Sequence, residues 1–123
     1  MKEALVLFAH GSRDPEWAQP FTVIAKRLSE SFEVRVAYLE AMRPSLGEAV
    51  ASLVAAGATS VRVVPLFLGA GGHVKQDLPR LVAAAASAHR DVDIALESPI
   101  GEEPAVLEAI AAAIVSTLAR RDS

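Results

Sequence analysis

Short apolar runs alternate along this chain with longer segments in which apolar residues recur every three or four positions. The first run is wholly apolar and typical of a parallel strand covered on both faces. The second begins with alternating polar and apolar positions, which favours an edge of the sheet. Pro65, in the third run, lacks the N–H for a ladder hydrogen bond, so pairing is expected to stop there on one side. The runs predict strands over Ala4–Ala9, Glu33–Leu39, Val61–Leu68 and Val92–Leu96.

The segments between these runs are amphipathic with the period of an α-helix and predict four helices. The apolar faces consist of Trp17, Phe21, Ile24 and Leu28; Leu46, Val50, Leu53 and Val54; Leu78, Leu81, Val82 and Ala85; and Val106, Leu107, Ile110, Ile114 and Leu118. The boundary signals are Asp14 and Asp77 as N-caps, Ser45 with Glu48 as a capping box, Gly57 as a C-terminal stop, and Pro20 as the cause of an irregular first turn.

Strand and helix alternate four times, which predicts an α/β domain with a parallel sheet and right-handed crossovers. The common doubly wound orders are Rossmann-like and flavodoxin-like. For a four-stranded parallel sheet flanked by helices we favour the flavodoxin-like order 2-1-3-4, because it places the alternating second strand at an edge. A length of 123 residues fits one domain over residues 1–123.

Composition narrows the class of protein. The chain is 52% hydrophobic and 22% charged, as in globular domains. No apolar run approaches the ~18 residues of a membrane span, so no membrane partner is expected. The absence of cysteine excludes disulfides and thiolate metal sites and suits a cytoplasmic protein. A net charge of −3 argues against a nucleic-acid partner.

Residues with metal-binding chemistry follow three of the predicted strands. His10 follows the first strand, Glu40 the second, and His73 follows the third after a glycine-rich loop. Ligands bind at the carboxyl edge of such sheets where the strand order reverses. Two imidazoles and a carboxylate there suit Co²⁺, Ni²⁺, Fe²⁺ or Zn²⁺. Each residue also has a structural interpretation, as a loop hydrogen-bonding group or a solvated strand end.

The loop Gly69-Ala70-Gly71-Gly72 lacks the spacing, lysine and hydroxyl of phosphate-binding motifs. It indicates close approach of the backbone to a flat or bulky ligand, or a plain strand-to-helix turn. Gly11-Ser12 lacks the nucleophile elbow of hydrolases. Ser12 and Arg13 face the mouth of the cleft or solvent. His89 lies in the last turn of the third helix and receives no function.

Three stretches, "LFAHGSRDP", "YLEAMRPSL" and "VVPLFLGAGGHVKQDLP", resemble the small sirohydrochlorin chelatases of CbiX type, in the same order over nearly the whole chain. The resemblance implies a chelatase-like fold and insertion of a divalent metal into sirohydrochlorin, with Co²⁺ for cobalamin as the first expectation and Ni²⁺ or Fe²⁺ as alternatives. The metal is then a substrate, with no tightly bound cofactor. His10 and His73 match the metal-site histidines of the family, and Glu40 matches its glutamate.

The resemblance also implies partners and further contacts. A neutral imidazole can hold the metal and accept a pyrrole proton, so His10 and His73 are the expected catalytic residues. Longer relatives contain two such domains, which implies a homodimer here. The last helix has more apolar residues than one narrow stripe needs, so it is a candidate for the dimer interface, with simple packing on the sheet as the alternative. The macrocycle carries many carboxylates, so basic residues are expected around it. The expected substrate contacts are Ser12, Arg13, Arg43, Leu68, Gly69, Ala70, Gly71, Gly72 and Lys75.

Two other functions remain open at this point. A non-catalytic metal- or tetrapyrrole-binding module would keep the same cleft for carriage or sensing. A phosphohistidine enzyme is suggested by His-Gly after the first strand, but Ala9 stands where such an enzyme would be expected to have an arginine.

Overall fold

Four parallel strands form one sheet in the order β2-β1-β3-β4 in the computed structural model, which describes residues 3–69 and 71–122. The predicted order is therefore confirmed, and β2 lies at an edge as its alternation indicated. The strands are β1 Ala4–Ala9, β2 Glu33–Tyr38, β3 Ser60–Pro65 and β4 Asp93–Leu96.

The third strand ends at Pro65, three residues before the predicted end. Pairing toward β1 continues by one residue, since the N–H of Leu66 donates to the carbonyl of Phe8 at 2.8 Å. Toward β4 the last bond runs from Glu97 N–H to the carbonyl of Val63. The missing N–H of Pro65 thus ends pairing on the β4 side alone, as expected.

The helices follow the predicted order, with two short 3₁₀ turns in addition. Asp14 accepts a hydrogen bond from Glu16 N–H at 3.0 Å and caps the irregular first turn, and the Ser45–Glu48 capping box is present. The helical elements are η1 Pro15–Ala18, α1 Gln19–Leu28, α2 Leu46–Ala55, α3 Gly72–Ala88, η2 Ile100–Glu102 and α4 Pro104–Asp122.

One helix start was predicted wrongly. The third helix, α3, begins at Gly72 with Gly71 as its N-cap, so Asp77 lies in the second turn and caps nothing. The glycines were interpreted as loop, but glycine is also tolerated at an N-cap position. Gly71 has extended backbone (φ −66°, ψ 163°) and directly precedes the first helical residue. The helix also contains Pro79.

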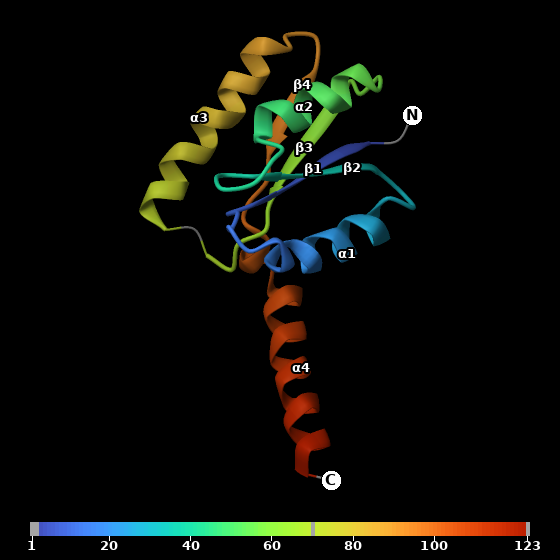
Figure 1. Ribbon diagram of the computed structural model, residues 1–123, viewed down its shortest axis with the longest axis vertical. Helices are drawn as coiled ribbons and strands as arrows, with labels where there is room; N and C mark the ends of the chain where they lie inside the picture. Colours follow the sequence, from blue (N-terminus) through green and yellow to red (C-terminus); the bar gives the residue numbers. More distant parts are fainter. Residues whose placement is uncertain (1–2, 70, 123) are drawn as a thin grey trace.

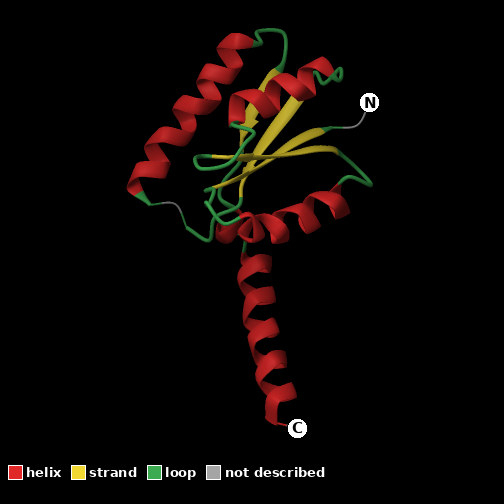
Figure 2. Cartoon of the chain, in the orientation of Figure 1, coloured by secondary structure: helices red, strands yellow, loops and turns green. Residues whose placement is uncertain are grey.

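The core lies between the sheet and the pair α2 and α3. Alternate residues of β1 (Ala4, Val6 and Phe8) and of β3 (Val61 and Val63) are inaccessible to solvent on this face. On the other face, α1 packs against β1 and β2 (Figure 2). Among the residues assigned to the apolar faces of the first three helices, Ile24 and Leu81 are exposed.

The last helix, α4, was expected from its apolar face to pack on the sheet or at a dimer interface. It extends away from the sheet as an isolated rod (Figure 1). Packing on the chain's own sheet is therefore not what this structure shows. In the described part of the chain, no helix is long and apolar enough to cross a membrane.

Candidate functional site

His10 and Glu40 form a contact just beyond the ends of β1 and β2. The ladder continues past both strands, with Leu39 N–H donating to the carbonyl of Ala9 at 3.0 Å and Glu40 N–H to that of His10 at 3.1 Å. The side chains then meet, with His10 Nε2 at 2.7 Å from Glu40 Oε1. Both are accessible, at 50% and 63% exposure. An imidazole and a carboxylate thus lie together, accessible to solvent, at the carboxyl edge of the sheet.

Gly11 makes this contact possible. Its φ is +104°, and a Cβ atom there would lie 1.8 Å from the carbonyl oxygen of Glu40. Close approach of a ligand was expected at the glycines of the loop after β3. At Gly11 the group that approaches is the backbone of Glu40, so the glycine brings the two loops together.

Three aromatic side chains support the β1–β2 end of the sheet. Trp17 lies 4.7 Å from Phe21 and 6.3 Å from Tyr38 between ring centroids. Tyr38, the last residue of β2, is buried, and burial raises the pKa of its hydroxyl. Tyr38 was not singled out from the sequence, because a tyrosine at a strand end is not a distinctive signal. Because Tyr38 is packed in this way, it holds the backbone of the chain two residues before Glu40.

His73 is the second residue of α3 and is exposed. The helix α3 begins near the carboxyl edge of the sheet (Figure 1). Within residues 3–69 and 71–122, no three His, Cys, Asp or Glu residues are grouped closely enough to hold a metal ion. The structure therefore brings His10 to Glu40 but does not bring His73 to them.

The glycine loop has open space around it. A Cβ atom on Gly69, Gly71 or Gly72 would meet nothing within 4 Å, and Leu68 is exposed. Ala70, also expected to contact the substrate, lies outside the described residues. These three glycines are exposed, so the backbone of the loop is accessible to a ligand.

Buried Gly101 in η2 anchors the first half of this loop. Its N–H donates to the carbonyl of Phe67 at 2.9 Å, and a Cβ atom would lie 2.1 Å from the carbonyl oxygen of Leu68. Phe67 in turn makes an edge-to-face contact with Phe8. Gly101 was not predicted from the sequence, since an isolated glycine before a helix is typical of an ordinary turn.

Of the side chains expected around an anionic substrate, two are engaged locally. The hydroxyl of Ser12 accepts a hydrogen bond from Asp14 N–H at 3.1 Å. Arg43 forms an ion pair with Glu48. The hydrogen bond from Arg43, followed by that from the Ser45 backbone, lowers the pKa of Glu48 from 4.5 to about 2. Glu48 therefore stays ionised, and Arg43 paired, at any pH near neutrality. Arg13 is exposed.

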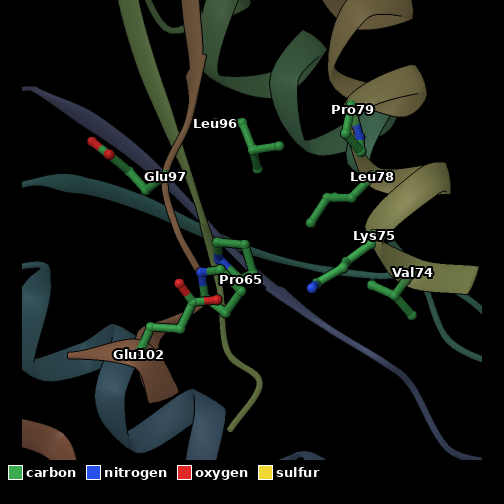
Figure 3. A pocket seen from close by; sticks show the side chains of 9 residues that line it. Pro65, Val74, Lys75, Leu78, Pro79, Leu96, Glu97 and Glu102 are labelled. Atoms are coloured by element: carbon green, nitrogen blue, oxygen red, sulfur yellow. The ribbon is translucent and has the colours of Figure 1, made fainter. Parts of the chain in front are cut away.

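Lys75 lies apart from these residues, in a small pocket between α3 and the ends of β3 and β4. The pocket has a volume of about 120 Å³. Its walls are mostly apolar, with Leu78 and Leu96 among them, and Lys75 extends into it with Glu102 on the opposite side (Figure 3). The basic residues thus lie around the edge of the sheet and not in one cluster.

Comparisons with known proteins show the family and agree with the fold. The sequence profile of the CbiX family matches residues 4–117. A sirohydrochlorin cobaltochelatase of Saccharolobus islandicus is 32% identical over 120 residues, covering 92% of this chain and 94% of that protein. A crystal structure described as a cobalamin biosynthesis CbiX protein from Marinobacter aquaeolei superposes with a TM-score of 0.85 at 36% identity, over 96% of this chain and 98% of that one.

A longer protein has the same fold. The sirohydrochlorin chelatase SirB from Bacillus subtilis subspecies spizizenii, solved in complex with cobalt, superposes with a TM-score of 0.80 at 28% identity. The match covers 94% of this chain but 51% of the SirB chain. This chain therefore corresponds to about half of that longer protein.

Proposed function

This chain belongs to the CbiX family, and from that premise we propose that it is a sirohydrochlorin chelatase, an enzyme that inserts a divalent metal ion into the macrocycle. The observation that carries the proposal is the 2.7 Å contact between His10 and Glu40 at the carboxyl edge of β1 and β2. In an open α/β sheet this edge is where ligands bind. The total absence of cysteine suits action in the cytoplasm.

The residue types suit a metal that must be bound and then released. A closed cage of four protein ligands holds its ion permanently, whereas a site with open positions accepts further ligands. His10 and Glu40 offer one nitrogen and one carboxylate, both accessible. The second imidazole is expected from His73 at the start of α3, which this structure does not group with the other two residues. Such a set leaves coordination positions free for the pyrrole nitrogens.

Metal entry also requires that two pyrrole N–H protons leave the macrocycle. A metal ion held by both groups would replace the hydrogen bond between Nε2 and Oε1, with the ring proton on Nδ1. Once the ion leaves, Nε2 would accept a pyrrole proton and donate it to Glu40 in a hydrogen bond. The Glu40 carboxylate fixes this orientation and stabilises the imidazolium that forms. His10 would thus serve both as a metal ligand and as a base as insertion proceeds.

The relatives differ in the metal ion for which they are named. The Saccharolobus relative is named for cobalt, and a 30% identical Bacillus subtilis relative is a sirohydrochlorin ferrochelatase. Imidazole and carboxylate serve Co²⁺, Fe²⁺ and Ni²⁺ alike. We place Co²⁺ first, for cobalamin synthesis.

The test of the function is a metallation assay with sirohydrochlorin in large excess over the protein, run separately with Co²⁺, Ni²⁺ and Fe²⁺. Repeated turnover well above the rate without protein is expected with at least one ion. One equivalent of product or less with every ion would instead identify a carrier that binds without catalysing.

We also propose that the working unit is a homodimer. One four-stranded domain has a single short ligand-binding edge, and a macrocycle with acidic side chains is wide relative to it. A second copy related by a two-fold axis would supply the opposite wall. The match to half of the SirB chain supports this, since that chain is long enough for two such units.

The anionic side chains of the macrocycle would meet Ser12, Arg13, Arg43, Lys75 and the loop from Leu68 to Gly72. Arg43 is the most suitable of these residues for a test of substrate binding. Its side chain is 84% exposed and already forms an ion pair with a carboxylate, that of Glu48. Replacing Arg43 by alanine is expected to raise KM for sirohydrochlorin about two- to fivefold with kcat unchanged, the size of one exposed ion pair. The matched control is Arg90→Ala, an exposed arginine that follows α3. Lower thermal stability with unchanged KM would show that Arg43 serves only the start of α2.

The proposed role of the imidazoles predicts a pH dependence. As the pH falls from about 8 to about 5, insertion is expected to slow, because a protonated imidazole neither binds a metal nor accepts a proton. The measurement is kcat/KM against pH with the metal ion saturating. A flat profile over this range would contradict histidine as ligand or base.

A further inference from the structure

Ala41, the residue directly after Glu40, has a backbone conformation that alanine rarely adopts. Its φ is +66°, and within residues 3–69 and 71–122 it is the one residue other than glycine with a positive φ. Across it, the N–H of Met42 donates to the carbonyl of Glu40 at 2.8 Å. A hydrogen bond between residues two apart, around a central residue of positive φ, defines a form of γ-turn that is rare and strained. Strained backbone thus lies directly beside the candidate site.

The ends of this loop are fixed, which explains why the strain persists. The N–H of Tyr38 donates to the carbonyl of Pro44 at 2.9 Å and so closes the loop that follows β2. Tyr38 is buried, and Ser45 and Glu48 form the capping box that begins α2. Strained conformations remain where the surrounding structure holds them in place. Residues 39–43 must reverse direction between two fixed points, and the γ-turn supplies part of that reversal.

The γ-turn also holds the backbone of Glu40. The carbonyl of Glu40 accepts the hydrogen bond from Met42 and lies against Gly11, where a Cβ atom would be 1.8 Å from its oxygen. The N–H of Glu40 donates to the carbonyl of His10 at 3.1 Å. Both polar groups of the Glu40 backbone are therefore engaged. Its side chain starts from a fixed position, from which it reaches Nε2 of His10.

The resulting spacing is close to that of two ligands of one metal ion. Nε2 of His10 and Oε1 of Glu40 are 2.7 Å apart. With bonds of about 2.1 Å to a divalent ion, two donors at right angles lie about 3.0 Å apart. A shift of a few tenths of an ångström would therefore convert the hydrogen bond into a pair of metal ligands. A group that is already held near its bound position loses less conformational entropy on binding.

We propose that Ala41 is a positioning residue for metal binding, because its strained γ-turn holds the Glu40 carboxylate beside His10 before the ion arrives. The side chain of Ala41 is exposed, so the effect comes from the backbone conformation and not from packing of the methyl group. The inference rests on the proposed function for the identity of the pair as a metal site. It goes further in making the affinity for the metal ion, and not the affinity for sirohydrochlorin, depend on this turn.

Valine at position 41 tests the turn, because a branched Cβ atom makes a positive φ much less favourable. Ala41→Val is expected to raise KM for Co²⁺ at least about tenfold, as the loss of a group that orients a metal ligand does, and to leave KM for sirohydrochlorin unchanged. The matched control is Ala56→Val, at an exposed alanine with a φ of −82° just after α2, which should keep both constants. Wild-type KM for Co²⁺ in Ala41→Val would overturn the proposal.

Glycine at position 41 tests the strain and does not depend on the folding of the valine variant. Glycine adopts positive φ without strain, so Ala41→Gly is expected to keep KM for Co²⁺ within about twofold and to raise the melting temperature by about 2–4 °C. At the ordinary backbone of Ala56, glycine only adds freedom to the unfolded chain, so Ala56→Gly should lower the melting temperature. Equal destabilisation by the two glycine substitutions would show that Ala41 is not strained, and the proposal would be wrong.

Binding of Co²⁺ alone distinguishes this inference from the chelatase activity. Calorimetric titration of the protein with Co²⁺, without macrocycle, is expected to give a Kd at least about tenfold higher for Ala41→Val than for the wild type. If this difference is found but the wild type does not metallate sirohydrochlorin, the role of Ala41 stands and the chelatase proposal falls. If the wild type metallates sirohydrochlorin and both proteins bind Co²⁺ equally well, the chelatase proposal stands and the role of Ala41 falls.

Discussion

Replacing His10 or His73 by alanine is expected to lower the rate of metal insertion by at least about 100-fold, the effect of losing a positioned base. His10 is half-exposed beyond the end of β1 and His73 is exposed at the start of α3, so neither truncation removes core packing. The fold should therefore persist, with an unchanged circular dichroism spectrum. The measurement is multiple-turnover metallation of sirohydrochlorin by each variant.

The chain contains its own control, because its third histidine lies at the other end of α3. His89→Ala is expected to keep the wild-type rate. Glu40→Gln keeps a hydrogen-bond acceptor beside His10 but removes the charge, and should cost about 10- to 100-fold, as the loss of a partner that orients a metal ligand does. Near-normal insertion by His10→Ala or His73→Ala would show that the site is not built on these two imidazoles.

Substituting Gly11 by alanine is expected to abolish insertion and to lower the free energy of unfolding by at least about 2 kcal/mol, because strained left-handed backbone and a clash combine. The added Cβ atom would lie 1.8 Å from the carbonyl oxygen of Glu40, which is backbone and cannot rotate away. The loops after β1 and β2 must then separate, and the His10–Glu40 contact is lost. Denaturant unfolding and the metallation assay measure the two effects.

Gly57 provides a matched comparison for this change. Its φ is +100°, close to the +104° of Gly11, but a Cβ atom there would meet nothing within 4 Å. Gly57→Ala should therefore cost stability through backbone strain alone and leave insertion unchanged. Equal losses of activity in the two variants would contradict the role of Gly11 in joining the two loops.

Most of the fold follows from local interactions, which can be predicted from the sequence. Three features depend only on residues close together in the sequence. They are the strand formed by the apolar run of β1, the capping box of Ser45 and Glu48, and the positive φ of Gly57 at the end of α2. The strand order follows from a general preference for right-handed crossovers together with the alternation in β2. The wrong start of α3 shows the limit of this reasoning, since Gly71 can begin a helix or remain in a loop with little difference in free energy.

The candidate site also has features that the sequence predicts and features that only the tertiary structure shows. The sequence by itself determined that His10, Glu40 and His73 follow three strands whose carboxyl ends meet at one edge, because parallel strands share their direction. Only the tertiary structure decided which of them touch: the close approach of Gly11 to the Glu40 backbone joins His10 to Glu40, while His73 on α3 is not grouped with them. The packing of α4 depends on surfaces far away in the chain or on a second copy, and no local pattern of residues encodes which surface a helix will cover.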